Sequence, residues 1–398
     1  MLSSLRSRKD GLLPVVLLAL LPALTACGRD LEPAAENPSE DDIPSILSQA
    51  AEPYPEPWRI TRELIAGIAY GDTAYMLRNP RATLVLEDGT WIVLDTQPLE
   101  FRLYSSDGTF LRSFGRQGQG PTDLRWSHTI SRLIDIGGGR FEYWCDWPIL
   151  IQTWNLEGEL LDIRSMDAGH PLVQRYSPRS LETFEDRIYT IAGSWRRNAA
   201  DETIATSHLV VSDWAGTFVD TLYTFETTPM DRWASMAQAA FDYPNFDTLL
   251  LTSIGRLYLS AWDSDWIMEI DRERGGAIRR FRLEHEPMTI PDHQIEGMRE
   301  ILGNDIAGGL AWLQERIWFL TMQEGPQGEI WVNRRGEPLD DGTWPVDVFT
   351  ADGEYRGRMQ HGFFFPPGST WRDPELFTIG AAEEDAPALV RLTFHPNP

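Results

Sequence analysis

The sequence Leu84-Val85-Leu86-Glu87-Asp88-Gly89-Thr90-Trp91-Ile92-Val93-Leu94-Asp95 places two apolar segments on either side of an Asp-Gly turn. A third segment follows at Phe101-Arg102-Leu103-Tyr104, and Asp107-Gly108 separates it from a fourth, Phe110-Leu111-Arg112-Ser113-Phe114. Short apolar segments separated by Gly turns are typical of β-strands joined in hairpins, because Gly adopts the positive φ that such turns need. The stretch therefore predicts a small antiparallel sheet.

The same order of segments returns along the rest of the chain. Later copies open at Gly139-Arg140-Phe141-Glu142-Tyr143-Trp144, Arg187-Ile188-Tyr189-Thr190-Ile191, Gly255-Arg256-Leu257-Tyr258-Leu259 and Gly328-Glu329-Ile330-Trp331-Val332, with turns at Gly158, Gly216, Gly276 and Gly353. Repeats that each form only a small antiparallel sheet indicate an all-β fold, the β-propeller. Six blades would take roughly 57 residues each, more than the usual ~40–50, so long loops must hold the excess.

Two kinds of strand support stacking of these sheets in a ring. Trp91-Ile92-Val93-Leu94 and Leu249-Leu250-Leu251 are apolar without alternation, so both of their faces must be covered. Arg279-Arg280-Phe281-Arg282-Leu283-Glu284 keeps its charges, as expected of an outer strand with one face in water. Radially packed blades provide both environments. An open β-solenoid is the alternative.

The last copy lacks one strand after Ala388-Leu389-Val390-Arg391-Leu392-Thr393-Phe394. We expect Trp58-Arg59-Ile60-Thr61-Arg62-Glu63-Leu64-Ile65, which precedes the first full copy, to complete it and close the ring, because closure hides both sheet edges. One short helical insertion is expected at residues 291–302, where Ile295 and Met298 share an apolar stripe and Gly303 follows.

The N-terminal residues have the pattern of an export signal. Arg6, Arg8 and Lys9 precede an apolar stretch, and Leu24-Thr25-Ala26-Cys27 follows it. This motif resembles the lipobox of bacterial lipoproteins, which implies a signal peptide over residues 1–26 and lipidation of Cys27. In such lipoproteins, Gly28 after the cysteine implies sorting to the outer membrane. A plain signal peptide or a transmembrane helix is the alternative, although the apolar stretch is short for a span.

The segment after Cys27 has a different composition from the repeats. From Arg29 to Pro57 it is rich in Pro, Glu, Asp, Ala and Ser, with too few large apolar residues to offset the loss of chain entropy. We therefore expect residues 27–57 to be a lipidated, disordered acidic tether. The propeller is then expected to occupy residues 58–398.

The charge balance excludes several classes of function. The chain has 35 Lys and Arg against 60 Asp and Glu, and removing residues 1–26 leaves 32 against 59, a net charge of −27. A domain this acidic repels nucleic acid and anionic lipid, so we expect no nucleic-acid partner and a membrane attachment made by acyl chains. Lys9 is the only lysine, so the mature chain cannot use Schiff-base chemistry or a phosphate-binding loop with its lysine.

The Gly-rich segment Phe114-Gly115-Arg116-Gln117-Gly118-Gln119-Gly120-Pro121 follows the first copy. With the lipobox, the tether and the repeated strands, it resembles bacterial six-bladed β-propeller lipoproteins related to NHL-repeat proteins. The resemblance covers essentially the whole mature chain and implies the fold and an address in the cell envelope. It brings no catalytic residues with it. Thr122-Asp123-Leu124 departs from the Gly-Glu-Phe that family members often have there.

Other motifs favour structural roles over chemistry. Gly115, Gly118 and Gly120 lack the lysine and the βαβ context of a nucleotide loop, which favours an inter-blade turn. Nothing in the sequence pairs Cys145 with a base, which favours a buried, inert thiol. The histidines form no zinc motif, and Asp263-x-Asp265 lacks the Gly and Glu of a calcium loop. We expect no cofactor and assign no metal ligand. The alternative that a cation such as calcium binds in the central channel stays open.

The candidate binding residues follow from strand order. In a propeller, loops from the second to the third strand and loops between blades open on one face. Aromatic rings beside Arg and carboxylate groups suit a glycan, a peptide or a carboxylated small molecule. The residues expected there are Arg116, Arg125, Trp126, His128, Asp146, Trp147, Trp195, Arg196, Arg197, Trp262, Asp263, Asp265, Trp266, Arg334, Arg335 and Trp344. The alternative is that several of these tryptophans only pack between blades.

The sequence thus favours a lipid-anchored module of the cell envelope that binds or scaffolds a small molecule, a glycan or an envelope protein. The alternative is a propeller hydrolase or lyase with its site at the channel mouth. NHL-like lyases use metal-bound histidine clusters, which are not evident in this sequence, and no catalytic residue is assigned.

Overall fold

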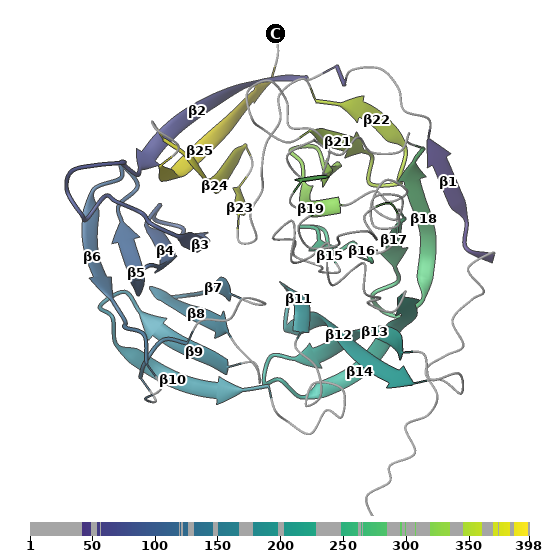
Figure 1. Ribbon diagram of the computed structural model, residues 1–398, viewed down its shortest axis with the longest axis horizontal. Helices are drawn as coiled ribbons and strands as arrows, with labels where there is room; N and C mark the ends of the chain where they lie inside the picture. The colour runs from purple at the N-terminus through teal and green to yellow at the C-terminus, as the bar shows by residue number, and fades with distance from the viewer. Residues whose placement is uncertain are drawn as a thin grey trace, which may run out of the picture. The chain divides into compact units, whose positions relative to one another are not determined.

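The chain folds into six β-sheets arranged around a common centre, which makes it a six-bladed β-propeller (Figure 1). Residues 37–398 form one compact unit. The computed structural model describes residues 42–48, 54–55, 57–118, 120, 122–125, 131–145, 150–166, 178–197, 203–227, 248–261, 264, 266–284, 295–296, 299, 307, 319–334, 345–359, 369–372, 374–382 and 386–396.

Each blade contains four strands that follow one another from the centre of the ring outward. Blade 1 contains β3 (Pro80–Val85), β4 (Trp91–Thr96), β5 (Leu99–Tyr104) and β6 (Phe110–Phe114). Blade 2 contains β7 (Ser131–Gly137), β8 (Arg140–Cys145), β9 (Leu150–Asn155) and β10 (Leu160–Ser165). Blade 3 contains β11 (Pro178–Phe184), β12 (Arg187–Arg197), β13 (Thr203–Asp213) and β14 (Phe218–Thr227).

The other three blades repeat this order, with additions from the N-terminal part of the chain. Blade 4 contains β15 (Thr248–Leu251), β16 (Leu257–Ser260), β17 (Ile267–Ile270) and β18 (Ala277–Leu283), with β1 (Ser45–Ser48) beside β18. Blade 5 contains β19 (Phe319–Glu324), β20 (Ile330–Arg334), β21 (Val346–Phe349) and β22 (Tyr355–Arg358). Blade 6 contains β23 (Thr370–Arg372), β24 (Glu375–Ala381), β25 (Pro387–Pro396) and β2 (Trp58–Ala66).

Strand β2 closes the ring, as the sequence predicted. It pairs antiparallel with β25 from Trp58 opposite Pro396 to Ala66 opposite Leu389. Strand β2, which precedes blade 1 in the sequence, and β25, the last described strand, therefore belong to the same sheet. The described strands form a closed ring and not an open solenoid. Closure removes the two sheet edges that an open array of blades would leave.

The core lies between the blades, where the middle strands are covered on both faces. Every residue from Trp91 to Asp95 is buried. The ring of Phe101 in blade 1 meets the rings of Phe141 and Tyr143 in blade 2 edge-on, with centroids 5.1 and 5.4 Å away. Such pairs contribute about 0.5–1.5 kcal/mol each beyond the burial of their surface. The outer strand β6, by contrast, is largely accessible to water.

The repeated Gly turns contribute directly to the packing between blades. Each turn between a third and a fourth strand has its glycine at positive φ, for example 84° at Gly108 and 90° at Gly353. A Cβ on Gly108 would lie 1.9 Å from the Ile65 carbonyl oxygen of blade 6, and one on Gly353 would lie 2.6 Å from the ring of Phe281 in blade 4. The glycines therefore allow each blade to approach its predecessor closely.

The segment from residue 42 to 57 differs from the disordered tether that its composition predicted. Strand β1 lies within it and pairs in parallel with β18, from Ser45 opposite Arg280 to Ser48 opposite Leu283. Ile43 and Tyr54 are buried. The boundary expected at Trp58 is therefore too late, because a few apolar residues in an otherwise polar segment are enough to dock it on an exposed strand edge. Residues 1–41 lie outside the described residues.

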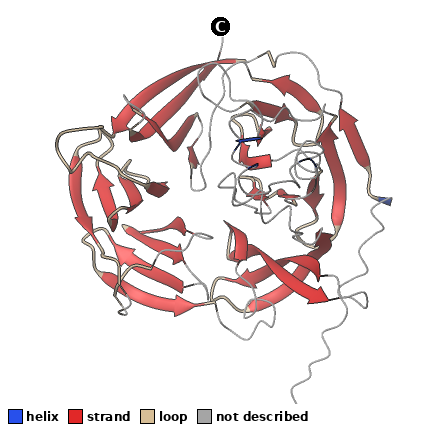
Figure 2. Ribbon diagram, viewed as in Figure 1, coloured by secondary structure: helices blue, strands red, loops and turns tan. Residues whose placement is uncertain are grey.

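Nearly all of the regular structure described is β-strand (Figure 2). The helix predicted over residues 291–302 falls almost entirely on positions that the structure does not describe, although Ile295, Glu296 and Arg299 within it are helical. Among the described residues, no helix is long and apolar enough to cross a membrane.

Candidate functional site

The alternating direction of the strands gives the propeller two different faces. The turns from first to second and from third to fourth strands lie on one of them, which we name the short-turn face. Many share one hydrogen-bond pattern: Ser105 N–H donates to the Thr109 carbonyl at 2.9 Å, and Thr350 N–H donates to the Glu354 carbonyl at 2.8 Å. The connections from second to third strands and from blade to blade lie on the opposite face, which we name the long-loop face.

The predicted binding residues were expected on the long-loop face, and the structure describes only some of them. Arg197 and Arg334 end the second strands β12 and β20, whose backbones are described. Arg116, Arg125 and Trp266 have described side chains. The positions that lie outside the described residues are Trp126, His128, Asp146, Trp147, Trp262, Asp263, Asp265, Arg335 and Trp344.

The second strand of blade 3 is longer than the second strands that the structure describes in the other blades. Strand β12 has 11 residues, whereas β8 has 6 and β16 has 4. Its partner β13 follows it to the end, with Arg197 opposite Thr203, and β14 continues to Thr227 opposite Ala205. Strand β11 pairs with β12 only as far as Ala192. Trp195, Arg196 and Arg197 therefore stand at the end of an extended hairpin, beyond the innermost strand.

Arg116 has an internal role in the first inter-blade turn. Its Nε donates to Asp123 Oδ1 at 2.9 Å, and the Gly120 N–H donates to Asp123 Oδ2 at 2.8 Å. These hydrogen bonds, with that of Arg116 the larger cause, lower the pKa of the Asp123 carboxyl. A Cβ on Gly118 would lie 2.1 Å from the same carboxylate. The glycines predicted to form an inter-blade turn thus make room for a buried Asp.

Arg125 follows this turn and is exposed. The Tyr143 hydroxyl donates to its backbone carbonyl at 2.7 Å, so the backbone here is held against blade 2. Of the predicted residues with described side chains, Arg116 and Arg125 are both exposed. Arg116 forms an ion pair with Asp123 of its own turn, whereas no described acid of that turn pairs with Arg125.

Trp266 stacks within its own blade. The Cζ atoms of Arg280 and Arg282, both on the outer strand β18, lie 4.5 and 4.6 Å from its ring centroid. These contacts of the ring thus lie within blade 4, whereas the alternative expected several tryptophans to pack between blades. Trp266 is half-buried, and the guanidinium groups of Arg280 and Arg282 already make cation–π contacts with its ring.

Sequence reasoning missed a set of buried carboxylates that pair with arginines of outer strands. Arg164 Nη1 of β10 lies 2.7 Å from Glu142 Oε1, and Arg358 Nε of β22 lies 3.0 Å from Asp347 Oδ1. Both carboxylates are buried. The signal that could have found them is a single acid inside an otherwise apolar middle strand, followed by an arginine in the next outer strand.

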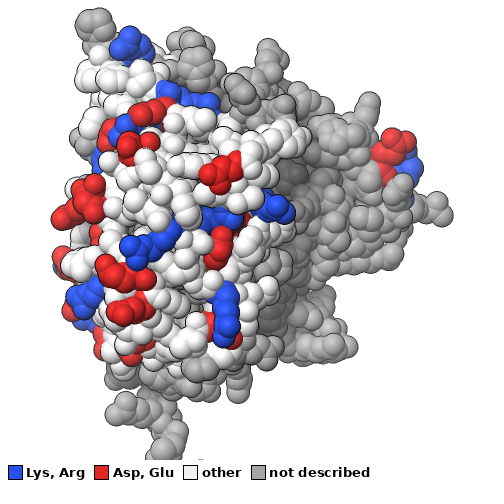
Figure 3. All heavy atoms as spheres, turned by 90° about the vertical axis from the view of Figure 1, so that its left-hand side faces the viewer, with Lys and Arg blue, Asp and Glu red and all other residues white. Residues whose placement is uncertain are grey.

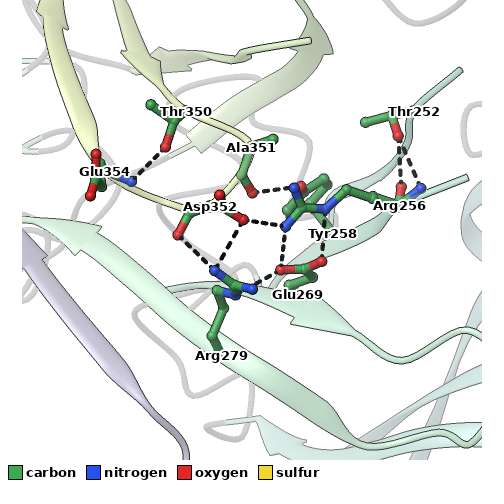
Figure 4. Close-up of polar contacts among 9 residues, drawn as sticks. All are labelled: Thr252, Arg256, Tyr258, Glu269, Arg279, Thr350, Ala351, Asp352 and Glu354. Atoms are coloured by element: carbon green, nitrogen blue, oxygen red, sulfur yellow. Dashed lines mark hydrogen bonds and ion pairs between the residues drawn. The ribbon is translucent and has the colours of Figure 1, made fainter. Parts of the chain in front are cut away.

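The largest such cluster joins blade 4 to blade 5 on the short-turn face (Figure 4). Arg256 Nη2 lies 2.8 Å from Glu269 Oε2 and 3.1 Å from Asp352 Oδ1. Arg279 reaches the same two carboxylates at 2.9 and 3.2 Å. The hydrogen bond to Glu269 raises the pKa of Arg256. Because its charges are matched within the cluster, this group serves to join the two blades.

Two tyrosines also make connecting contacts, Tyr258 in the second strand of blade 4 and Tyr104 at the end of the third strand of blade 1. The Tyr258 hydroxyl donates to the Ala351 carbonyl of blade 5, and the Tyr104 hydroxyl donates to the Ala74 carbonyl, each at 2.8 Å. Burial raises the pKa of Tyr104 to about 12 and also raises that of Tyr258. Both hydroxyls therefore stay protonated and act as structural donors.

Three further features of the described part of the chain bear on its chemistry. Cys145 is completely buried in the core between blades 1 and 2, as the sequence predicted. No group of three His, Cys, Asp or Glu among the described residues could hold a metal ion. On the side of the ring where β6 lies, acidic and basic side chains are interspersed without a patch of one sign (Figure 3).

Comparison with known proteins identifies the fold. No protein-family model and no curated protein match the sequence. A candidate exported protein of Bacteroides fragilis is similar in structure, with a TM-score of 0.52 and 11% identity over 87% of this chain and 99% of that one. Regucalcin, a calcium-binding protein of Agrobacterium tumefaciens, gives a TM-score of 0.42 and 11% identity over 89% and 97%. Virginiamycin B lyase of Staphylococcus aureus gives 0.39 and 10% over 84% and 99%. Of these three structures, only the first is similar enough to support an argument. Its similarity and the closed ring of six sheets identify the fold of this chain as a six-bladed β-propeller.

Proposed function

We propose that this propeller is a lipid-anchored, non-enzymatic binding module of the cell envelope, and that its long-loop face holds an envelope protein or glycan. The single observation that carries the proposal is the extended hairpin of β12 and β13 in blade 3. It adds paired strand beyond the point where the innermost strand β11 ends its pairing. The described second strands of the other five blades have only 4 to 7 residues, so closure of the ring does not depend on an 11-residue strand.

The residue types at the end of this hairpin suit a partner with carboxylate groups. Trp195, Arg196 and Arg197 follow one another in a chain with a net charge of −25. Arginine forks bind carboxylates with two hydrogen bonds, and tryptophan adds a broad apolar surface at low entropic cost. Arg125 adds an exposed cation on the same face. Acidic proteins and acidic glycans both offer the complementary groups.

The proposed address rests on the N-terminal sequence. Leu24-Thr25-Ala26-Cys27 resembles a lipobox, and Gly28 is the residue that favours the outer membrane. The similarity to a candidate exported protein agrees with export of this chain. Cys27→Ser is expected to leave the precursor uncleaved or mislocalised, because the thiol is the acyl acceptor.

The lysine content of the chain allows a sharp test of the binding face. Lys9 is the only lysine and lies within the proposed signal peptide. In the mature protein, Arg196→Lys would therefore introduce the only side-chain amine while keeping the positive charge. An amine-reactive crosslinker applied to intact envelopes should then join the R196K protein to a partner.

The matched control is Arg274→Lys, the same change on the opposite face. Arg274 is exposed in the turn between β17 and β18 on the short-turn face. The wild-type protein reports any background from the N-terminal amine. A crosslinked species specific to R196K supports the proposal. Equal products from R196K and R274K, or a product from R274K alone, would contradict it.

A further inference from the structure

We propose that the outer edge of blade 4 is a strand-exchange site, at which an extended acidic segment of a partner protein takes the place of β1. The segment carries an aliphatic residue between two acidic residues. The site belongs to a different blade from the extended hairpin of β12 and β13. The inference therefore goes beyond the binding function proposed above and does not depend on it.

Strand β1 shows how such a segment binds. It pairs in parallel with β18 as the fifth strand of blade 4, beginning with Ser45 opposite Arg280 (Figure 1). The Arg280 N–H donates to the Pro44 carbonyl at 2.9 Å, and the Glu284 N–H donates to the Ser48 carbonyl at 2.6 Å. These hydrogen bonds use only the backbone of β1, so another extended segment with suitable side chains is able to form them.

The closed ring does not need β1. Each of the six sheets has four strands without it, and β2 closes the ring through its pairing with β25. Strand β1 has 4 residues, whereas β2 has 9. Because a short strand at a sheet edge is held by few contacts, it can leave by local opening while the propeller stays folded.

The contact of Ile46 specifies the middle residue of the segment. Ile46 lies opposite Phe281. It packs against a core cluster in which Phe281 is joined by Tyr258 of blade 4 and Phe349 of blade 5. An aliphatic side chain is therefore required at this position.

The positions on either side of Ile46 face arginines. Ser45 lies opposite Arg280, and Leu47 lies opposite Arg282. Arg280 Nε donates to Ser45 Oγ at 2.8 Å, so a side chain at this position of β1 reaches the guanidinium group. Leu47 is 51% exposed. A carboxylate at each of these two positions would form charge-assisted hydrogen bonds with the arginine opposite, which neither Ser nor Leu provides.

The surroundings of the site also favour an acidic occupant. Strand β18 has three arginines among its 7 residues, although the whole chain has a net charge of −25. The side chains of Arg280 and Arg282 both lie against the ring of Trp266, which orders them. Ordered guanidinium groups lose less entropy when they bind a carboxylate. A segment with the pattern acid–aliphatic–acid thus matches β18 better than β1 itself does.

The first test measures binding of fluorophore-labelled peptides with the sequence of residues 42–48. One peptide has Glu at the positions of Ser45 and Leu47, an isosteric control has Gln at both, and a third is unchanged. They are titrated into the full chain with Ile46→Asp, which removes the apolar contact of β1 and frees the edge. We expect the Glu peptide to bind about tenfold more tightly than the Gln peptide, because it forms two additional ion pairs.

The wild-type chain serves as the competition control. Its own β1 is present at high effective concentration, so it should bind the Glu peptide more weakly than the Ile46→Asp chain does. Equal binding to the two chains would place the peptide elsewhere. Equal affinities of the Glu and Gln peptides would overturn the acidic specificity. Tightest binding of the unchanged peptide would overturn it too, in favour of exchange between copies of this chain.

The second test places the acidic residues in the chain itself and needs no peptide. Ser45→Glu combined with Leu47→Glu should hold β1 more tightly than the matching pair of Gln substitutions. Hydrogen exchange of the Arg280 and Glu284 amides, which donate to β1, should then be about tenfold slower. Exchange of the buried Val93 amide should not differ between the two variants. Equal exchange at Arg280 and Glu284 would overturn the proposal even where the peptides bind too weakly to measure.

Discussion

The two faces of the ring are built from different kinds of connection. On the short-turn face, turns such as residues 105–109 and 350–354 repeat one hydrogen-bond pattern, and their glycines touch the preceding blade. Toward the long-loop face, the described second strands differ in length from blade to blade, and β12 of blade 3 is the longest of them at 11 residues. Repeated contacts are what a closed ring needs, whereas varied loops are free to change without opening it. The comparison suggests that stability depends mainly on one face and recognition on the other.

The largest effect on stability is expected when the ring is opened. Deleting residues 28–66 removes β2 and leaves β25 without its outer partner, so we expect the melting temperature to fall by more than about 10 °C with a broader transition. Deleting residues 28–42 should change nothing. Deleting residues 28–57 should have an intermediate effect, because it removes β1 and the Tyr54 contact to Glu329. Thermal melts of soluble proteins check this, and equal melting temperatures would show that the ring closes differently.

The next largest loss of stability is expected when the packing of the Gly turns between blades is disturbed. Gly108→Ala places a Cβ 1.9 Å from the Ile65 carbonyl oxygen, so we expect a loss of about 3 kcal/mol in the free energy of unfolding. Gly276→Ala is the control, because its φ is also positive, at 82°, and no atom lies within 4 Å of the added Cβ. Backbone strain alone should then cost about 1 kcal/mol. Similar losses in urea melts would mean that contact between blades is unimportant here.

The charge cluster between blades 4 and 5 should contribute less. Asp352→Asn removes the carboxylate that bridges Arg256 and Arg279, but the Asp352 side chain is 68% exposed. We therefore expect a loss of about 0.5–1 kcal/mol that shrinks at high salt. Glu354→Gln in the same turn is the control for a general change in charge. A loss of several kcal/mol for D352N, independent of salt, would assign the cluster a larger role.

The smallest effect on stability is expected on the long-loop face. Replacing Arg196 and Arg197 together by Ala should change the free energy of unfolding by less than about 0.5 kcal/mol, as for most surface substitutions. Crosslinking of the partner through a nearby introduced amine should nevertheless fall. Unchanged capture at an unchanged melting temperature would move the binding site elsewhere on this face. A large loss of stability would instead assign the two arginines to the fold.

Much of the fold could be predicted because its signals are local. The apolar run Trp91-Ile92-Val93-Leu94 and the turns at Gly108 and Gly353 are each visible within a few residues. The closing strand was also predicted, since the last copy was one strand short. Most of the residues predicted for the candidate face lie outside the part of the chain that the structure describes.

The contacts that the sequence did not predict are those that the folded chain makes. The docking of β1 was missed because composition averaged over residues 27–57 concealed the short apolar segment around Ile43 and Ile46. Arg116 pairs with Asp123 while its side chain stays 83% exposed, and Trp266 stacks with Arg280 and Arg282. In each case the partner is chosen by which side chains the folded ring brings into reach.

The amino-acid sequence alone determined the strand order, the closing strand and the positions of the Gly turns, because alternation, turn chemistry and a missing repeat are properties of short segments. Only the tertiary structure decided which acids pair with which arginines, where the tether docks and how far blade 3 extends. The physical reason is distance along the chain. Ser45 and Arg280 are 235 positions apart, and nothing local to either residue specifies the other until the ring has closed.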